Sequence, residues 1–352
     1  MSSVDLVVPC YNYARYLEGC VASLLSQRDV DVRVLIIDDA SPDETPEVAR
    51  RLAAADPRVA YLRNERNLGL TETANRGVMG WARADYVVLI SADDQLTPGS
   101  LARATRLMDA YPEVSMSYGM ALMLSDDGPE LRPPDPAEAP TRIVPGKAFL
   151  RHVCEAGNPV PTPCAVMRTR VQHEIGGYDA SFPHTSDADT WMRAARVGSI
   201  GVINTVQGLY RWHAFNMSAG YLGRPLGDRA EMIATCRAFE RRYGGDIPEF
   251  GTWLRAMEQR FGQAALAIAS ASFADLEDDT WEASLAFARE HWTGFRRSPV
   301  FWKLMLKRAI GRNAYIALRQ SLRVPGRASL GRAWHDHGMQ IGWWPGAEGR
   351  AG

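Results

Sequence analysis

The sequence has almost no net charge, few cysteines and no long apolar run. Its 40 basic residues nearly balance 41 acidic ones, so the chain as a whole gives no reason to expect a nucleic acid partner. The five cysteines form no Cys-x-x-Cys pair and no zinc-ligand spacing, which favours reduced thiols. No stretch approaches the roughly eighteen apolar residues of a membrane span, and the first residues do not have the layout of a signal peptide. These absences predict a cytoplasmic protein, with a peripheral membrane contact left open.

Short β-branched runs alternate with helical patterns through residues 1–120, which predicts β/α units and a parallel sheet. We expect strands at 6–8, 32–37, 60–63 and 86–90, and helices at 16–27, 46–55 and 70–83. A stretch rich in Pro, Asp and Gly at 125–146 is typical of a loop. The predicted fold class is α/β, with a doubly wound, mostly parallel sheet flanked by helices and a mainly α-helical C-terminal region.

Polar residues follow each of the four predicted strands. In such sheets the ligand lies beyond the carboxyl ends of the strands, where the connecting loops gather. The polar loops here are residues 9–12, 38–41, 64–67 and 91–94. Their convergence at one edge predicts a nucleotide site.

Two pairs of adjacent carboxylates stand out among these loops. Asp93 and Asp94 would repel each other without a cation, and carboxylates suit Mg²⁺ or Mn²⁺ that also binds substrate phosphates. The alternative is that they belong to a turn or helix cap. Asp38 and Asp39 could accept hydrogen bonds from a base or ribose, or Asp38 could cap the helix that follows.

Six motifs in register resemble the family 2 glycosyltransferases of the GT-A fold. They are residues 7–12, 37–43, 64–69, 91–94, 176–179 and 187–191, and the likeness extends over roughly residues 3–218. The resemblance implies that Asp39 reads a pyrimidine ring and that Asp93 faces the ribose or the metal ion. It implies a nucleotide-sugar site made of Pro9, Tyr11, Asn12, Asp39, Asn67 and Asp93.

The same resemblance implies a metal that bridges the donor diphosphate. Asp93 and Asp94 stand in the acidic metal motif of the family, but Ser91 replaces the carboxylate with which this motif often begins. Either one carboxylate ligand is absent, or Asp94 is the main ligand. His213 stands where many relatives have a metal- or diphosphate-binding histidine, and an imidazole suits Mn²⁺ better than Mg²⁺. A structural role for His213 is the alternative. The predicted cofactor is Mn²⁺ or Mg²⁺.

Asp187 is the candidate general base, because the family places its catalytic carboxylate in this acidic motif. A single base and direct displacement would invert the anomeric configuration. The alternative is that Asp187 and Asp189 are carboxylates favoured by the dipole of a helix that we expect to start at about Trp191.

The C-terminal region, 221–352, is strongly basic and aromatic from about residue 289. Residues 289–335 hold eleven Lys or Arg against one acid, Glu290. Three interpretations stay open: a helical appendage that packs on the catalytic domain or another subunit, a contact with an anionic membrane or lipid-linked acceptor, and binding of an anionic acceptor. Nucleic acid is disfavoured, because no recognition motif accompanies the charge.

The sequence therefore predicts a catalytic domain at 1–220, with its nucleotide-sugar part at 1–120 and its acceptor side at 121–220. The predicted function is an inverting, metal-dependent transfer of sugar from a UDP- or dTDP-sugar. The acceptor is left open among saccharides, lipid-linked groups, small metabolites and peptides. A nucleotidyltransferase would need a Gly-rich phosphate loop after the first strand, which residues 9–12 do not provide. A non-catalytic nucleotide-sugar binding protein is the other alternative.

Overall fold

The computed structural model describes residues 1–129, 131, 133, 135–213, 216, 226–274, 280–321 and 337–342. The chain divides into two compact units. One comprises Met1–Ala219 together with Trp334–Gly352, and the other comprises Gly220–Ala333. The described residues 337–342 thus belong to the first unit, where Gln340 and Ile341 pair with a long strand of the sheet.

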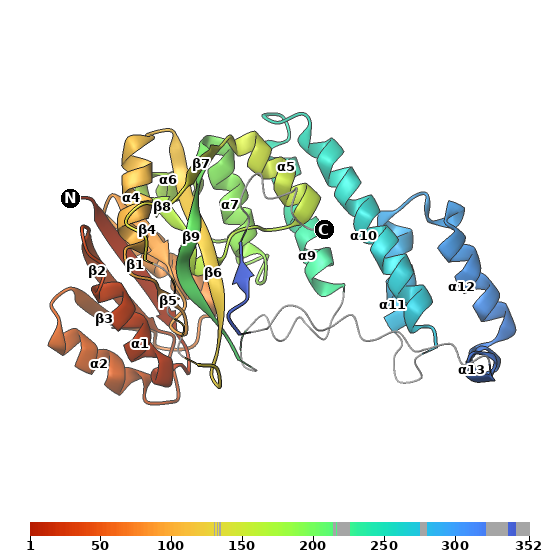
Figure 1. Ribbon diagram of the computed structural model, residues 1–352, viewed down its shortest axis with the longest axis horizontal. Coiled ribbons are helices and arrows are strands. Elements are labelled where there is room, and N and C mark those ends of the chain that lie inside the picture. Colours follow the sequence, from red (N-terminus) through yellow and green to blue (C-terminus); the bar gives the residue numbers. More distant parts are fainter. Residues whose placement is uncertain are drawn as a thin grey trace. The chain divides into compact units, whose positions relative to one another are not determined.

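The first unit is built on one mixed sheet (Figure 1). Its strand order is β3-β2-β1-β4-β8-β6-β9-β5, with β10 paired to β6 and β7 paired to β9. Strands β1 to β4 run parallel, whereas β5, β7, β8 and β10 each pair antiparallel to a neighbour, so the predicted α/β class is confirmed and the sheet is mixed. The strands are β1 Ser3–Cys10, β2 Asp31–Asp38, β3 Val59–Arg63, β4 Tyr86–Leu89, β5 Gln95–Leu96, β6 Val114–Ser125, β7 Thr141–Val144, β8 Val166–Arg168, β9 Ser199–Trp212 and β10 Gln340–Ile341.

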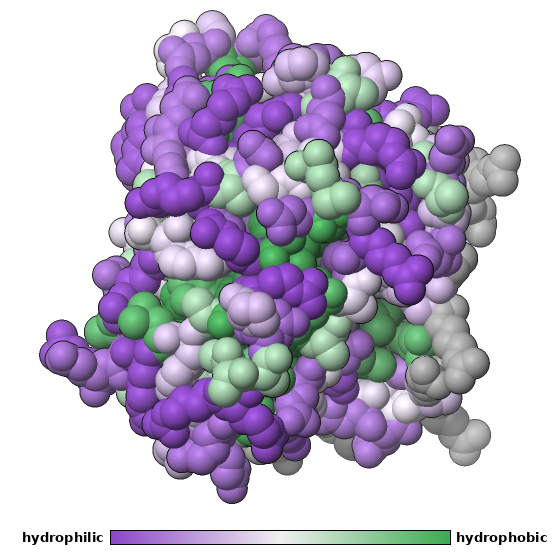
Figure 2. All heavy atoms as spheres, turned by 90° about the vertical axis from the view of Figure 1, so that its left-hand side faces the viewer, coloured by the Kyte–Doolittle hydropathy of each residue, from purple (hydrophilic) through white to green (hydrophobic). Residues whose placement is uncertain are grey.

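Helices flank this sheet and bury its β-branched positions. Leu6 and Ile36, from neighbouring strands, share one core cluster with Leu17 and Leu24 of the first helix. Figure 2 views the side on which β3 and α2 lie, where hydrophilic residues cover most of the face and apolar ones gather across its middle. The helices of this unit are α1 Ala14–Leu25, α2 Thr45–Ala55, α3 Leu70–Asn75, η1 Arg76–Trp81, α4 Ser100–Ala110, α5 Gly146–Ala156, η2 Thr162–Cys164, α6 Thr169–Ile175 and α7 Ser186–Val197.

Two local differences from the sequence prediction appear in this unit. The helix expected at 70–83 is α-helical only to Asn75 and continues as the π-helix η1. This segment lies directly on β1, since a Cβ added to Gly77 would fall 2.2 Å from a methyl carbon of Val7. The expected loop at 125–146 also contains β7, which gains its stability from antiparallel pairing with β9, a partner more than fifty residues away in sequence.

The second unit is helical in its described residues. Phe239 and Phe250 pack in its core with ring centroids 4.8 Å apart. No helix in the described part of the chain is long and apolar enough to cross a membrane. The helices are α9 Gly227–Tyr243, α10 Phe250–Ser272, α11 Thr280–His291, η3 Phe295–Arg297, α12 Pro299–Ile310 and α13 Arg312–Ser321.

Candidate functional site

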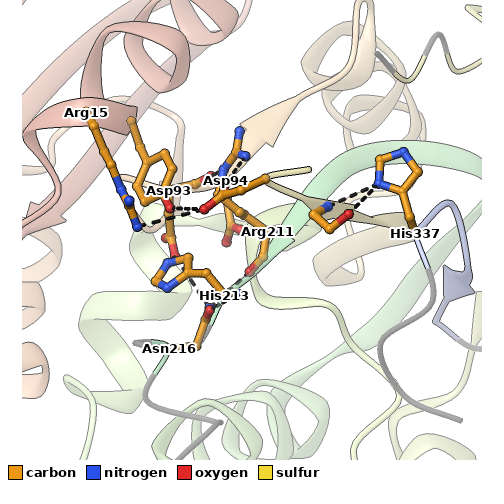
Figure 3. Close-up of polar contacts among 10 residues, drawn as sticks. Arg15, Asp93, Asp94, Arg211, His213, Asn216 and His337 are labelled. Carbon is orange, nitrogen blue, oxygen red and sulfur yellow. Dashed lines mark hydrogen bonds and ion pairs between the residues drawn. The ribbon is translucent and has the colours of Figure 1, made fainter. Parts of the chain in front are cut away.

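The acidic pair Asp93 and Asp94 lies in the turn that follows β4, and both residues are buried. The backbone N–H of Asp94 donates to the carbonyl oxygen of Ser91 at 3.1 Å, which closes the turn. Arg211, near the end of β9, holds both acids: its backbone N–H donates to Asp94 Oδ1 at 2.8 Å, and its Nε donates to the carbonyl oxygen of Asp93 at 3.0 Å. Figure 3 shows these side chains meeting between the two strand ends.

His213 completes this cluster. Its Nε2 lies 3.1 Å from Asp93 Oδ2, and the imidazole stacks on the ring of Tyr16 with centroids 5.3 Å apart (Figure 3). Tyr13 meets the same imidazole edge-on at 5.3 Å. Asn216 accepts a hydrogen bond from the backbone N–H of His213. The structure therefore places His213 against Asp93, whose charge in turn acts on Asp94.

The electrostatics of the cluster suit a cation. Burial and the neighbouring charge of Asp93 raise the pKa of Asp94 well above its usual value, because two buried carboxylates disfavour a second negative charge. Asp93 Oδ1 is buried and has no hydrogen-bond partner among the described residues, which is the state of an oxygen available to a ligand. Asp94 Oδ1, by contrast, is occupied by Arg211. Asp93 thus offers the more available oxygen, although one interpretation of the sequence made Asp94 the main ligand.

Among the described residues, no group of three or more His, Cys, Asp or Glu side chains is placed to hold a metal ion by itself. Mg²⁺ and Mn²⁺ commonly bind through one or two carboxylates, with substrate phosphates and water completing the shell. Asp93 Oδ1, which lacks a hydrogen-bond partner among the described residues, lies next to Asp94 and His213. This arrangement fits a metal site completed by substrate and water, and it does not fit a site formed by protein ligands alone.

Asp39, the residue after β2, binds the loop that follows β3. Its carboxylate accepts hydrogen bonds from the backbone N–H groups of Leu68 and Gly69, both at 2.8 Å, and from Asn64 Nδ2 at 2.7 Å. Gly69 has a φ of +84°, a conformation that glycine adopts without strain. Asn67, which is exposed, also accepts from the N–H of Gly69 at 3.0 Å. The sequence did not predict that Asp39 fixes a neighbouring loop.

The loops after β1 and β2 lie side by side and carry backbone strain. Asn12 and Ala40 both have positive φ, +60° and +58°, and Ala40 has no side chain that favours this region. The N–H of Asn12 donates to Ser41 Oγ at 3.1 Å, which ties the two loops together. Pro9 is buried at the end of β1, whereas Tyr11 is exposed. An exposed aromatic ring beside polar loops can stack on a base.

Asp187 lies in the first turn of α7. The helix begins at Ser186, earlier than the sequence indicated, so Asp187 is inside the helix rather than ahead of it. Its Oδ2 accepts hydrogen bonds from Asn158 Nδ2 at 3.1 Å and from Thr162 Oγ1 at 3.0 Å. Burial raises the pKa of Asp187, and these bonds, with one from the Ala188 N–H, oppose the shift only in part. The residue keeps partial solvent exposure, as a base must.

Asp189, two positions further on, has a different environment. It forms a buried ion pair with Arg193 at 2.8 Å, and Arg193 also donates to the carbonyl oxygens of Ile175 and Gly177. Asp189 is therefore part of a structural link between α7 and the end of α6. Trp191 is buried and its ring contacts Tyr178 edge-on. It is therefore a core residue, and its ring is not exposed for stacking on a sugar.

The short helix η2 connects Asp187 to the acidic pair. Thr162, its first residue, holds Asp187, and Cys164, its last, is close enough to Asp94 for that charge to add to the effect of burial in raising the thiol pKa. Three residues of one turn thus connect the two sets of carboxylates.

Asp126 is a residue of this site that sequence reasoning missed. It accepts a hydrogen bond from the Tyr16 hydroxyl at 2.6 Å and pairs with Arg211 Nη1 at 2.9 Å. Burial favours a higher pKa for Asp126, but the bonds from Tyr16 and Arg211 outweigh it and hold this pKa below its usual value. In the sequence Asp126 belongs to an ordinary Ser-Asp-Asp-Gly turn, and no local signal distinguishes it.

The sequence around the acidic pair is similar to a known protein family. A family model described as glycosyl transferase family 2 matches residues 5–169. Residues 5–169 are therefore similar to this family. The match covers β1 to β8 and includes the acidic pair, but it ends before Asp187 and His213.

Individual relatives and solved structures are also similar to this chain. The succinoglycan biosynthesis protein ExoA of Rhizobium meliloti is 31% identical over 212 residues, which cover 55% of this chain and 58% of ExoA. The chain spans less than two thirds of the length of several such relatives. S. aureus TarS 1–349 in complex with UDP-GlcNAc matches with a TM-score of 0.60 at 15% identity, over 91% of each chain. The mannosyltransferase PcManGT from Pyrobaculum calidifontis, in complex with GDP-Man and Mn²⁺, matches with a TM-score of 0.52 at 19% identity, over 92% of this chain and 88% of that one. These structural matches identify the GT-A fold.

Proposed function

We propose that this chain is an inverting glycosyltransferase that moves a sugar from a nucleoside diphosphate sugar to an acceptor nucleophile. The family domain supports glycosyl transfer, and two proteins of the same fold have been solved with nucleotide sugars. The observation that carries the proposal is the presence of two separate carboxylate sets. The pair at Asp93 suits a diphosphate and its cation, while Asp187 has the hydrogen bonds and raised pKa of a base.

Asp187 is the proposed general base. A carboxylate with a raised pKa is a stronger proton acceptor, and it can take the proton of an acceptor hydroxyl as that oxygen attacks the anomeric carbon. Asn158 and Thr162 both donate to Oδ2, so they orient the carboxylate and leave room at Oδ1 for one further contact besides the Ala188 N–H. Displacement in one step at the anomeric carbon inverts its configuration.

Asp93, Asp94 and His213 are the residues that would hold Mn²⁺ or Mg²⁺. Such an ion neutralises negative charge on the departing diphosphate. The Arg211 backbone N–H donates to the Asp94 carboxylate, and its Nε donates to the backbone carbonyl of Asp93. Tyr16 fixes the imidazole plane of His213 by stacking. The chain therefore orders this site before a donor arrives, which reduces the entropic cost of binding.

The donor is proposed to be a UDP- or dTDP-sugar. Tyr11 offers an exposed ring for stacking. In the described part of the chain Asp39 Oδ2 accepts a hydrogen bond from the Gly69 N–H, and a carboxylate oxygen can accept one more from a pyrimidine N–H. The acceptor is proposed to carry a hydroxyl group, whose proton Asp187 would remove.

The test is a thermal-shift and turnover screen of UDP- and dTDP-sugars, each with and without Mn²⁺. We expect a stabilising shift and slow hydrolysis with one donor. The substitution Asp187→Asn should lower turnover by roughly 10² to 10⁴-fold and leave the donor dissociation constant within about twofold. Glu174→Gln, which removes an exposed carboxylate from α6, is the matched control.

Two results would reject parts of the proposal. Donor binding without any turnover, unchanged in Asp187→Asn, would favour a non-catalytic nucleotide-sugar binding protein. Release of pyrophosphate from a nucleoside triphosphate and a sugar phosphate would favour a nucleotidyltransferase.

A further inference from the structure

Helix α12 exposes an apolar stripe. Trp302 and Leu306 are each 63% exposed and Ile310 is 41% exposed, and their spacing of four residues places them on one face of the helix. Leu318 of α13 is a further large apolar residue that is exposed. Scattered exposed apolar residues are ordinary, but an aligned set of three on one helix suggests an interaction surface.

The opposite side of α12 is fixed to its own unit. Leu304 is fully buried, and Lys307 Nζ donates to the backbone carbonyl and hydroxyl oxygens of Ser270 on α10. The same ammonium lies 5.1 Å from the ring centroid of Tyr315 on α13. These contacts set the rotation of the helix, so the exposure of the stripe follows from packing.

All charged side chains in the segment around the stripe are basic. Residues 295–321 contain no Asp or Glu, and their basic residues are Arg296, Arg297, Lys303, Lys307, Arg308, Arg312 and Arg319. Arg296, Arg297, Lys303 and Arg308 are exposed. The chain as a whole has a formal charge of −1, so this concentration of positive charge is local.

We propose that α12 lies in the plane of an anionic lipid surface. Trp302, Leu306 and Ile310 would enter the boundary between headgroups and acyl chains. The exposed basic residues of the same segment would contact lipid phosphates; they are Arg296, Arg297, Lys303 and Arg308. A helix of 12 residues is about 18 Å long, too short to cross a hydrocarbon core of about 30 Å, so it lies on the surface and does not span it. This proposal does not depend on the proposed transferase activity.

Charge distinguishes a lipid surface from a second copy of the chain. In a two-fold dimer formed through the stripe, the basic segments of both copies would face each other without an acid in either. Like charges juxtaposed across an interface oppose association. A nucleic acid would satisfy the charge but would gain nothing from the exposed aliphatic carbons of Leu306 and Ile310.

The experiment is co-sedimentation of the full chain with vesicles of phosphatidylcholine alone or mixed with phosphatidylglycerol. We expect binding to the mixed vesicles only, weakened by salt because the Debye length shortens to about 3 Å at 1 M. Trp302→Ala combined with Leu306→Ala should lower the partition coefficient roughly tenfold or more. Arg297→Glu combined with Lys303→Glu should lower it by a similar or larger factor.

A matched control separates this surface from general basicity. Arg241→Glu with Arg255→Glu reverses two exposed basic residues on α9 and α10, outside the stripe, and should change partitioning by less than about threefold. All changed residues are exposed, so melting curves should match that of the unchanged protein. Equal binding to both kinds of vesicle, or equal loss in control and test variants, would overturn the proposal. So would self-association in the absence of lipid that Trp302→Ala abolishes.

Discussion

The backbone N–H of Arg211 donates to the Asp94 carboxylate across a sequence separation of 117 residues. This bond joins the end of β9 to the turn after β4, and the Arg211 side chain continues to the carbonyl of Asp93 and to Asp126. The acidic pair therefore depends for its position on a strand that lies outside the first half of the sheet.

Asp126 should act on the acidic pair through Arg211 and on His213 through Tyr16. Asp126→Asn keeps an oxygen that can accept from Tyr16 but removes the charge that pairs with Arg211. Asp126 is itself exposed, and an exposed ion pair contributes up to about 1 kcal/mol, so we expect Mn²⁺-dependent donor affinity to fall by up to about fivefold. Calorimetric titration measures it. Asp127→Asn, on the same turn and exposed, should change nothing, and equal effects of both variants would refute the link.

Replacing Asp187 should make the protein more stable while removing its activity. The pKa of Asp187 is raised in the folded state, so the folded chain holds this proton more tightly than the unfolded one. The stability that this adds is present at low pH and is lost as pH rises through the folded-state pKa. At neutral pH the ionised group therefore costs stability, and Asp187→Asn should raise Tm at pH 7 and lose that advantage near pH 3. A lower Tm at pH 7 would contradict this.

Thr162 should set the pH at which the base works. Its hydroxyl donates to Asp187 and lowers a pKa that burial raises, so Thr162→Val should raise this pKa further. The acid limb of the kcat/KM profile, where activity requires the ionised carboxylate, should then move to higher pH. Thr162→Ser keeps the hydroxyl and should restore the original limb. An unmoved limb in Thr162→Val would exclude Asp187 as the group that titrates.

Asp189→Asn should have the opposite effect on stability from Asp187→Asn. It removes the partner of Arg193 in a buried pair and leaves a guanidinium charge uncompensated, which typically costs about 3–5 kcal/mol. Urea unfolding measures this loss. Glu174→Gln should stay within about 0.5 kcal/mol of the unchanged chain. If Asp189→Asn unfolded at the same urea concentration as the control, the buried pair would not have the structural role assigned to it.

Chelation should separate donor binding from folding. If Asp93 and its neighbours hold a divalent ion with the donor diphosphate, EDTA should abolish turnover while Tm of the free protein shifts by less than a degree or so, since the chain provides no closed cage in its described residues. Excess Mn²⁺ should restore activity. Asp93→Asn should remain folded and require more Mn²⁺ for half-maximal turnover. Full turnover in EDTA would reject the metal site.

Much of the first unit follows from local sequence patterns. The β-branched runs predicted β1 to β4 within a few residues, because a strand buried on both faces requires continuous apolar residues such as Val34 to Ile37. The polar loops predicted the edge at which Asp39 and Asp93 lie, since parallel strands present their carboxyl ends together. Here the sequence suffices because each element's pattern is short-range.

The remaining features depend on contacts between distant residues. β7 has no strong local signal and forms only where β9 offers an edge. Asp187 and Asp189 look alike in sequence. Hydrogen bonds from Asn158 and Thr162 make Asp187 a candidate base. The ion pair with Arg193 makes Asp189 a buried structural residue. The choice depends on which groups three-dimensional packing brings within hydrogen-bond reach.

The sequence by itself determined the α/β class, the acidic pair after β4 and the basic character of residues 295–321. The tertiary structure alone decided that Arg211 holds both acids, that Asp126 joins this cluster, and that Trp302 and Leu306 face outward. Periodicity and composition record what each segment prefers. The partners of a charged or apolar side chain depend on long-range packing, which no local pattern contains.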